Sequence, residues 1–372
     1  MKSTNHQSHR VIISGGGTGG HVFPAIAIAN ALKEKDKHIE ILFVGAKGRM
    51  EMEKVPAAGF PIEGLWISGF QRKLTIKNLL FPMKVLISLQ KAKRIIKRFK
   101  PHVAVGVGGY ASGPTLRAAI GQKIPALIQE QNSYPGITNK ILSRSVQKIC
   151  VAYEGMDQYF PAQKIVLTGN PVRRQVIMIE GKREEAADFF KLDPDRKTVL
   201  VVGGSQGAMS INKSVHKHLG IFETLGIQLV WQTGKLYYQE AIAAVRPENI
   251  NLLSVHEFID RMDLAYAMAD IIVSRAGAIA ISEICAVGKP PVFIPLPSAA
   301  EDHQTKNARA LVEKDAAIMI SDRDAMKNLG IVLTDLVNDT QKQEALGRNA
   351  LSLAKPSAAD AIANEIIKLI IK

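Results

Sequence analysis

The fold of this chain is indicated by two similar stretches, VIISGGGTGG at residues 11–20 and VLVVGGSQGA at residues 199–208. Each has the pattern of a buried β-branched strand, a glycine-rich turn and the start of a helix. Glycine lets the backbone turn tightly, and the free N–H groups at a helix start favour phosphate or sugar oxygens. We therefore predict two Rossmann-like domains, whose glycine turns together grip a diphosphate from opposite walls of a shared gap.

Alternating strand and helix patterns extend this prediction to the rest of the chain. Short apolar runs predict strands at 10–14, 39–44, 103–107, 125–129, 148–152, 165–168, 198–202, 227–231, 250–253, 270–273, 291–294 and 316–320. Helical patterns separate most of them, as at 22–35, 84–99, 209–219, 279–287 and 303–313. This alternation predicts α/β domains with parallel sheets covered on both faces. We expect an N-terminal domain at 1–170, a C-terminal domain at 171–356, and a last helix at 357–372 that packs back on the first domain.

The composition is that of an ordinary globular protein, with 372 residues, 47% apolar and 22% charged. Apolar runs are too short for the roughly 18 residues that span a bilayer. The polar first ten residues resemble no secretory signal, so we expect the chain to stay in the cytoplasm. Cys150 and Cys285 lie in apolar segments, which predicts buried free thiols and excludes a disulfide scaffold.

The net charge of +14 is concentrated in one segment, because residues 70–101 contain ten Lys and Arg residues and no acid. Part of this segment has the apolar spacing of a helix with one buried side, which predicts a core stripe of Val85, Leu89, Ala92, Ile96 and Phe99. The remaining apolar residues at 74–81 lie among basic ones, which predicts docking of residues 70–100 on an anionic membrane surface. Few aromatics and no known motif accompany the charge, so nucleic acid is disfavoured as a partner. A solvated, lysine-rich helix is the alternative.

The first glycine turn also matches G-x-G-x-x-G through Gly15, Gly17 and Gly20. Dinucleotide binding further requires an acid at the end of the second strand, which here ends in glycine, alanine and lysine at 45–47. A dehydrogenase is therefore disfavoured. His21 follows at the helix start, where the helix dipole favours a neutral imidazole that can accept a proton from a hydroxyl. A capping or core histidine is the alternative.

Two further loops follow predicted strands of the first domain. One contains Tyr110 in GVGGYASG at 106–113, and the other contains Asn132 in QEQN at 129–132. Because open α/β sheets bind ligands at the carboxyl ends of their strands, we expect both residues at the same crevice as His21.

Three segments of the second half suit a nucleotide sugar. GGSQG at 203–207 offers backbone donors and one hydroxyl to a diphosphate, or is only a packing turn. The segment SRAGAIAISE at 274–283 follows the strand predicted at 270–273 and begins a helix. Its Glu283 could accept two hydrogen bonds from vicinal ribose hydroxyls, or be a solvated helix carboxylate. Gln304 and Asn307 share one helical face and suit sugar hydroxyls, although ordinary polarity at a helix start is equally consistent. Asp193 and Asp195 precede a strand in a proline turn, so no metal site is predicted.

Taken together, these motifs resemble the MurG family, the N-acetylglucosaminyltransferases that act on undecaprenyl-diphospho-muramoyl-pentapeptide. The resemblance runs from about residue 10 to residue 355. It rests on GGTGGH at 16–21, GGY at 108–110, EQN at 130–132, GNPVR at 169–173, GGSQG at 203–207 and HQTKNA at 303–308. It implies a GT-B fold, with two Rossmann-like domains whose parallel sheets face a central cleft and with the donor bound mainly by the second domain.

The resemblance also implies an activity, the inverting transfer of GlcNAc from UDP-GlcNAc to the 4-hydroxyl of MurNAc in lipid I, which gives lipid II. His21 and Tyr110 are the expected catalytic residues, and neither a cofactor nor a metal is expected. The implied donor-binding residues are Thr18, Gly19, Gly20, Asn132, Arg173, Ser205, Gln206, Ile259, Ala278, Ile279, Ala280, Ile281, Ser282, Glu283, Gln304 and Asn307.

Particular roles follow by the same resemblance. Arg173 and Ser205 would meet the diphosphate, the backbone of Ile259 would read uracil, Glu283 would hold the ribose, and Gln304 would hold the GlcNAc hydroxyls. The chain departs from the family at 279–281, which reads Ile-Ala-Ile where Leu-Thr-Val is frequent, and a hydroxyl contact from Ala280 is therefore lost.

The expected partners are UDP-GlcNAc, lipid I and the anionic inner leaflet, and the expected location is the cytoplasmic face of the cell membrane. Three other functions remain open on the sequence. They are another UDP-sugar-dependent lipid glycosyltransferase, a UDP-GlcNAc 2-epimerase, and a non-catalytic protein that binds a nucleotide sugar.

Overall fold

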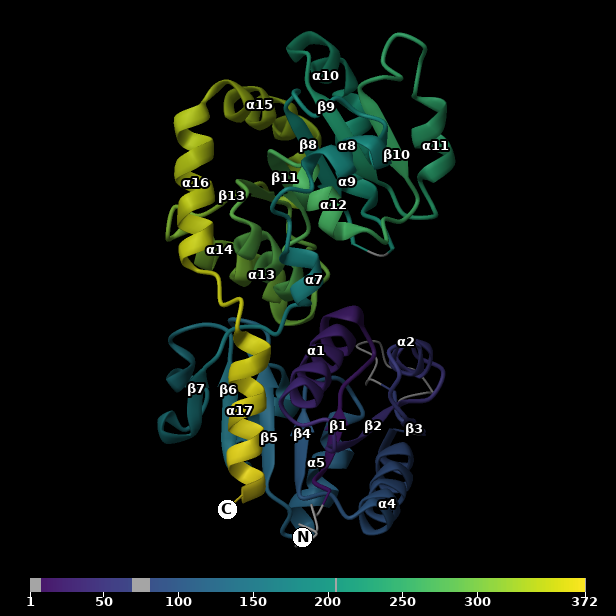
Figure 1. Ribbon diagram of the computed structural model, residues 1–372, viewed down its shortest axis with the longest axis vertical. Helices are drawn as coiled ribbons and strands as arrows, with labels where there is room; N and C mark the ends of the chain where they lie inside the picture. The colour runs from purple at the N-terminus through teal and green to yellow at the C-terminus, as the bar shows by residue number, and fades with distance from the viewer. Residues whose placement is uncertain (1–7, 69–80, 205, 372) are drawn as a thin grey trace, which may run out of the picture. The chain divides into compact units, whose positions relative to one another are not determined.

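The computed structural model describes residues 8–68, 81–204 and 206–371 (Figure 1). Ser205 and the amino-terminal part of the predicted membrane segment lie outside the described residues. The chain divides into two units. Unit 1 extends to Val172 and resumes at Pro356, and unit 2 comprises Arg173–Lys355. Each unit has one parallel sheet, as the strand–helix alternation predicts.

Unit 1 contains a seven-stranded sheet in which β1 lies between β2 and β4. In spatial order the strands are β3 (Ile62–Leu65), β2 (Glu40–Ala46), β1 (Arg10–Ser14), β4 (Val103–Gly106), β5 (Ala126–Glu130), β6 (Lys148–Val151) and β7 (Ile165–Leu167). The chain leaves β1 toward one edge of the sheet and leaves β4 toward the other. Their carboxyl ends therefore form the switch point at which open α/β sheets bind ligands.

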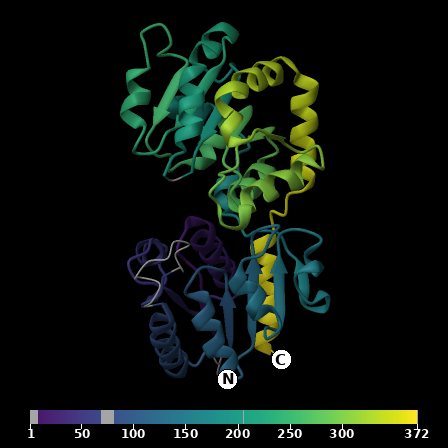
Figure 2. The same ribbon diagram turned by 180° about the vertical axis from the view of Figure 1, so that it is seen from behind.

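Helices cover both faces of this sheet. On one face lie α1 (Gly19–Lys35), α2 (Glu51–Ala57) and α17 (Ala358–Ile371), and on the other lie α4 (Phe81–Phe99), α5 (Ser112–Gly121) and α6 (Ile137–Ser143). Two short 3-10 turns, η1 (Met156–Gln158) and η2 (Ala162–Lys164), precede β7. Figure 1 shows α17 beside α1, and Figure 2 shows α4 and α5 over the opposite face. Ile13 packs into the first layer and Ile12 into the second, which is why the strands are continuous apolar runs.

Unit 2 contains a six-stranded sheet with its switch point between β8 and β11. In spatial order the strands are β10 (Leu253–His256), β9 (Gln228–Gln232), β8 (Thr198–Val202), β11 (Ile271–Ser274), β12 (Pro291–Phe293) and β13 (Ile318–Met319). The helices are α7 (Arg174–Ile177), α8 (Arg183–Phe190), α9 (Met209–Lys217), α10 (Leu219–Leu225), α11 (Tyr238–Ala243), α12 (Met262–Met268), α13 (Ala278–Val287), α14 (His303–Val312), α15 (Ala325–Asn338) and α16 (Thr340–Ser352), with 3-10 turns η3 (Ala300–Asp302) and η4 (Asp322–Asp324). Trp231 is fully buried in the core that α9, α10 and α15 cover.

Most predicted strands agree with the structure to within one or two residues, and the differences have local causes. The strand predicted at 250–253 begins three residues later, as β10 at Leu253–His256. The side chain of Asn249 accepts a hydrogen bond from the N–H of Arg246, and the backbone stays in a turn up to Leu252. The helix predicted at 209–219 breaks at His218, whose Nδ1 lies 2.8 Å from the carbonyl oxygen of Ser214. The unpredicted β3 reads IEGL and has no apolar run.

The two cysteines are buried and free, which confirms the prediction. Burial raises the pKa of each thiol to about 12. None of the helices that the structure describes is both long and apolar enough to span a bilayer.

Candidate active site

The first glycine loop, residues 15–20, follows β1 and is closely packed at Gly16, where it meets Glu51 and the loop after β4. A Cβ on Gly16 would lie 2.1 Å from Oε1 of Glu51, and a Cβ on Gly109 would lie 2.2 Å from the carbonyl oxygen of Gly16. Gly17 and Gly109 also have φ angles of +89° and +84°, which L-residues with side chains rarely adopt. Glycine is therefore required where the loops after β1 and β4 meet.

His21 lies in the first turn of α1 and packs directly on the loop after β4. A Cβ on Gly108 would lie 2.5 Å from Cδ2 of His21, and Oγ1 of Thr18 lies 3.2 Å from its Nδ1. Tyr110 is half-exposed, and its ring lies 3.9 Å from the position of a Cβ on Gly17. The structure thus brings Thr18, His21 and Tyr110 together at the switch point of unit 1.

The loop after β5 is held by Glu130, a carboxylate that is only 2% exposed. It accepts hydrogen bonds from the backbone and side-chain nitrogens of Asn132, both at 3.1 Å, from the N–H of Gly136 at 3.1 Å and from Nδ2 of Asn139 at 2.8 Å. Burial raises the pKa of this carboxyl. Nε2 of Gln131 donates to the carbonyl of Val107 at 2.7 Å, which ties the position of Asn132 to the loop after β4.

The second glycine loop follows β8 and packs against the loop after β9. A Cβ on Gly207 would lie 2.1 Å from the carbonyl oxygen of Thr233, and a Cβ on Gly234 would lie 2.5 Å from the carbonyl oxygen of Gln206. The N–H of Gly207 donates to the carbonyl of Gly204 at 2.8 Å and closes the turn. As in unit 1, the backbones of two loops meet where no side chain fits.

Gln232, at the end of β9, links this loop to the segment expected to read uracil. Its side chain is buried, donates to the carbonyl of Gly204 at 3.0 Å and accepts from the N–H of Ile259 at 3.2 Å. The N–H of Ile259 is therefore bonded to protein in this structure. The sequence analysis did not select Gln232, because its two partners lie 28 and 27 residues away.

The tight contact at Gly207 predicts a difference between two neighbouring glycines. Gly204 and Gly207 both have positive φ, but no atom lies within 4 Å of a Cβ on Gly204. We expect Gly207→Ala to lower the free energy of unfolding by about 3 kcal/mol, from clash and backbone strain together, and Gly204→Ala by about 1 kcal/mol, from strain alone. Urea unfolding of the two variants measures the difference, and equal losses would contradict the packing described here.

Glu283 occupies the second turn of α13 and is only 7% exposed. Tyr266 donates its hydroxyl to Oε2 at 3.1 Å, and Nη2 of Arg173 lies 3.8 Å from Oε1. Burial raises the pKa of the carboxyl, while Arg173 and the bond from Tyr266 oppose that rise. The alternative of a solvated helix carboxylate is therefore wrong, since a buried carboxylate with these two partners is held in one orientation.

The remaining candidates on α13 and α14 differ in exposure. Ala278 and Ile281 are buried, whereas Ile279, Ala280 and Ser282 are partly exposed. The hydroxyl of Ser282 donates to the carbonyl of Ala278 at 2.9 Å. Farther along, Oε1 of Gln304 accepts from the N–H of Leu296 at 2.9 Å and holds the loop before α14. Asn307 is fully buried, so its side chain does not face solvent in this structure.

Arg275 supports the same edge of the sheet, and the sequence analysis assigned it no role. Its guanidinium donates to the carbonyls of Ile294 and Pro295 at 2.9 and 3.1 Å, to Asp322 at 2.5 Å and to the hydroxyl of Ser210 at 2.9 Å. It therefore joins the loops after β11 and β12 to the start of α9. A lone arginine directly after an apolar strand is the one signal in the sequence that could have identified it.

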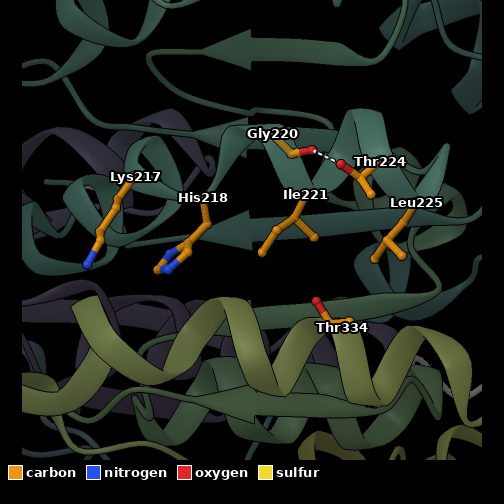
Figure 3. Close-up of a pocket in the computed structure, with 7 residues that line it drawn as sticks. All are labelled: Lys217, His218, Gly220, Ile221, Thr224, Leu225 and Thr334. Atoms are coloured by element: carbon orange, nitrogen blue, oxygen red, sulfur yellow. Dashed lines mark hydrogen bonds between the residues drawn. The ribbon is translucent and has the colours of Figure 1, made fainter.

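A cavity of about 350 Å³ in unit 2 lies elsewhere, beside α10 and α15 (Figure 3). Its lining residues are Lys217, His218, Gly220, Ile221, Thr224, Leu225 and Thr334. None of the candidate site residues lines it. Across residues 8–68, 81–204 and 206–371, no three His, Cys, Asp or Glu side chains are arranged to hold a metal ion. The Asp193 carboxylate instead accepts from the N–H of Asp195 at 3.0 Å within a turn.

Two doubly wound parallel sheets, each with a glycine turn at its switch point, are the architecture of the GT-B fold. Residues 11–151 match the glycosyltransferase family 28 N-terminal domain, and residues 198–363 match the glycosyltransferase family 28 C-terminal domain. The chain belongs to this family, and within it to the MurG family.

Relatives and solved structures match this chain over nearly its full length. The Flavobacterium psychrophilum UDP-N-acetylglucosamine–N-acetylmuramyl-(pentapeptide) pyrophosphoryl-undecaprenol N-acetylglucosamine transferase is 52% identical over 364 residues, which cover 98% of each chain. The crystal structure of Acinetobacter baumannii MurG has a TM-score of 0.78 at 29% identity and covers 97% of this chain and 99% of that one. The UDP-GlcNAc 2-epimerase of Neisseria meningitidis has a TM-score of 0.69 at 15% identity, covers 96% of this chain and 100% of that one, and shares the fold alone.

Proposed function

We propose that this chain transfers GlcNAc from UDP-GlcNAc to the 4-hydroxyl of the muramoyl sugar in lipid I, which gives lipid II for peptidoglycan synthesis. The observation that carries the proposal is 52% identity, over 98% of both chains, to a relative named for this transfer. The grouping of His21, Thr18 and Tyr110 in unit 1 and the buried Glu283 in unit 2 support it with suitable chemistry.

Unit 2 supplies the groups that suit the donor. The Glu283 carboxylate, oriented by Tyr266, can accept hydrogen bonds from the vicinal ribose hydroxyls. Arg173 lies beside it, with a side chain that is 39% exposed and can reach a diphosphate. The N-terminus of α13 and the second glycine loop add backbone N–H groups. Arg173 and these backbone N–H groups together would stabilise the negative charge that grows on the leaving UDP.

Unit 1 supplies the base for the acceptor. In the proposed displacement, the muramoyl 4-oxygen bonds to the anomeric carbon of GlcNAc, the bond from that carbon to UDP breaks, and the configuration inverts. The hydroxyl proton passes to His21. Oγ1 of Thr18 lies 3.2 Å from Nδ1 of His21, and in the tautomer in which Nδ1–H donates to this hydroxyl the basic lone pair is on Nε2.

The direct test is transfer of labelled GlcNAc from UDP-GlcNAc to a short-chain lipid I analogue. We expect one GlcNAc per acceptor, with or without EDTA, because Arg173 and backbone N–H groups are proposed to carry the leaving-group charge. Transfer to a glycerolipid instead would favour another lipid glycosyltransferase. Isomerisation of UDP-GlcNAc without an acceptor would favour the epimerase, and nucleotide-sugar binding without turnover would favour a binding protein. Loss of transfer in EDTA would overturn the metal-free mechanism.

We also propose that the amino-terminal half of α4 docks on the anionic cytoplasmic leaflet. The predicted stripe packs as a core side of this helix, with Ala92 and Ile96 buried. Another side presents Met83, Leu86 and Ile87 to solvent, with Leu86 62% exposed. The ammonium group of Lys84 lies 5.5 Å from the ring of the exposed Trp66. An apolar patch with basic residues around it suits the boundary between anionic headgroups and acyl chains.

Docking through this patch predicts a loss of vesicle binding in the double variant Leu86→Ser, Ile87→Ser. We expect affinity for vesicles containing phosphatidylglycerol to fall at least about tenfold, because each such side chain contributes about 1.5–3 kcal/mol when fully buried. Co-sedimentation measures the binding. Ile331→Ser, at an exposed position on α15 in unit 2, is the control and should bind like the unmodified chain. Unchanged binding of the double variant would remove α4 from the docking surface.

A further inference from the structure

Glu51, the first residue of α2, is a fully buried carboxylate that the proposed reaction does not use. Its Oε2 accepts the N–H of Gly17 at 2.9 Å, and its Oε1 accepts the N–H of Ala46 at 2.9 Å. Glu51 therefore bridges the first glycine loop and the end of β2. A buried charge is costly unless hydrogen bonds compensate it, so these two N–H groups are an essential part of its environment.

The side chain of Glu51 occupies space that is open only because its neighbours are glycines. A Cβ on Gly16 would lie 2.1 Å from Oε1, and a Cβ on Gly45 would lie 2.5 Å from Cγ. In a Rossmann loop, backbone N–H groups ordinarily point at a phosphate of the ligand. Here the N–H of Gly17 points at a carboxylate of the protein itself. The N–H of Gly17 is therefore bonded to the protein, whereas the sequence predicts that both glycine turns together grip a diphosphate.

On its other side, the first glycine loop packs against the loop that contacts His21, the proposed base. The carbonyl of Gly16 packs under Gly109, and the adjacent Gly108 packs under the imidazole of His21. Glu51, the glycine loop, the Gly108–Gly109 backbone and His21 thus lie in succession, each packed closely on the next. A shift of the loop at Glu51 is therefore transmitted to the imidazole, because tightly packed layers cannot deform independently.

We propose that Glu51 is a positioning residue, a built-in anion that takes the place of a phosphate in the first glycine loop and holds His21 in its reactive position. Nucleotide diphosphate binding is then left to the glycine loop of unit 2. The proposal rests on the proposed function for its kinetic readout, but it also makes a prediction about the loop itself that needs no turnover.

The test compares Glu51→Gln with Glu53→Gln, which removes an exposed carboxylate from the same helix. Glutamine keeps the volume of Glu51 but turns an NH₂ group toward one of the two N–H donors. We expect kcat for transfer to fall about 10- to 100-fold, as for loss of a hydrogen bond to a charged group, with KM for UDP-GlcNAc changed less than about twofold. Amide hydrogen exchange in a peptide spanning residues 14–22 should accelerate. Glu53→Gln should change neither quantity.

Chemical rescue tests the role as an anion. In Glu51→Ala, formate should occupy the vacated cradle, restore part of kcat and slow exchange in the 14–22 peptide, whereas KCl at equal ionic strength should not. If the alanine variant does not fold, the glutamine variant still decides the matter. Wild-type kcat and exchange rates in Glu51→Gln would overturn the proposal. A rise in KM for UDP-GlcNAc as large as the fall in kcat would also overturn it. Failure of the unmodified chain to transfer GlcNAc would instead overturn the proposed function, and the exchange measurements would still report on Glu51.

Discussion

Replacement of His21 by alanine is expected to lower kcat for GlcNAc transfer by about 10²- to 10⁴-fold, the usual contribution of a positioned general base. The imidazole is held by Thr18 and by the backbone of Gly108, in a loop cluster that also presents Tyr110. Removing it leaves the muramoyl hydroxyl without a proton acceptor at that position. Donor binding should persist, because Glu283 and Arg173 belong to unit 2.

Steady-state kinetics and UDP titration measure these two effects separately. His38→Ala is the matched control, since His38 is an exposed histidine of unit 1 in the turn before β2. It should retain wild-type kcat. If His21→Ala turned over like the His38 variant, another group would have to accept the proton, and Tyr110 would be the next candidate to replace.

The second large effect is expected for Glu283→Gln, which should lower kcat/KM for UDP-GlcNAc by about 10²- to 10⁴-fold. Each hydrogen bond to a charged group contributes about 1.5–3 kcal/mol, and the carboxylate can accept one from each vicinal ribose hydroxyl. An amide has a single acceptor oxygen, and Tyr266 already donates to one oxygen of the side chain. The loss should appear mainly in KM, because the ribose is bound in the ground state as well as in the transition state.

Glu240→Gln, which removes an exposed carboxylate on α11, is the control and should leave KM unchanged. The raised pKa of Glu283 adds a second readout. Since burial raises this pKa above 4.5, the carboxylate is protonated at a higher pH than an ordinary glutamate and then accepts fewer hydrogen bonds. KM for UDP-GlcNAc should therefore rise as the pH falls through the raised pKa, and Glu283→Gln should lack that rise. A KM profile shared by both proteins would remove Glu283 from the donor site.

Stability should respond to the same titration with the opposite sign. The folded chain takes up a proton on Glu283 more readily than the unfolded chain does, so protonation favours the fold. The contribution of this group to the free energy of unfolding should rise as the pH falls from its raised pKa toward 4.5 and be complete below that value. Comparing the pH dependence of urea unfolding in the unmodified chain and in Glu283→Gln isolates this contribution.

The elements that could be predicted are those whose signal is local. An apolar run followed by glycines predicts β1 and β8 directly, because strand, turn and helix start lie within ten consecutive residues. The strand β3 could not be predicted, because IEGL becomes a strand only by pairing with β2. The break between α9 and α10 depends on a contact of the His218 side chain, which helical periodicity does not encode.

The amino-acid sequence by itself determined the two parallel sheets, the positions of the glycine turns and the residue types that suit a nucleotide sugar, since these follow from nearest-neighbour chemistry along the chain. The tertiary structure alone decided which polar side chains are buried and what they hold. Glu51 reaches Gly17 across 34 residues, Gln232 reaches Gly204 across 28, and Arg275 reaches Asp322 across 47. A buried polar group must find a partner, and in a doubly wound sheet that partner comes from a neighbouring strand end that is distant in sequence.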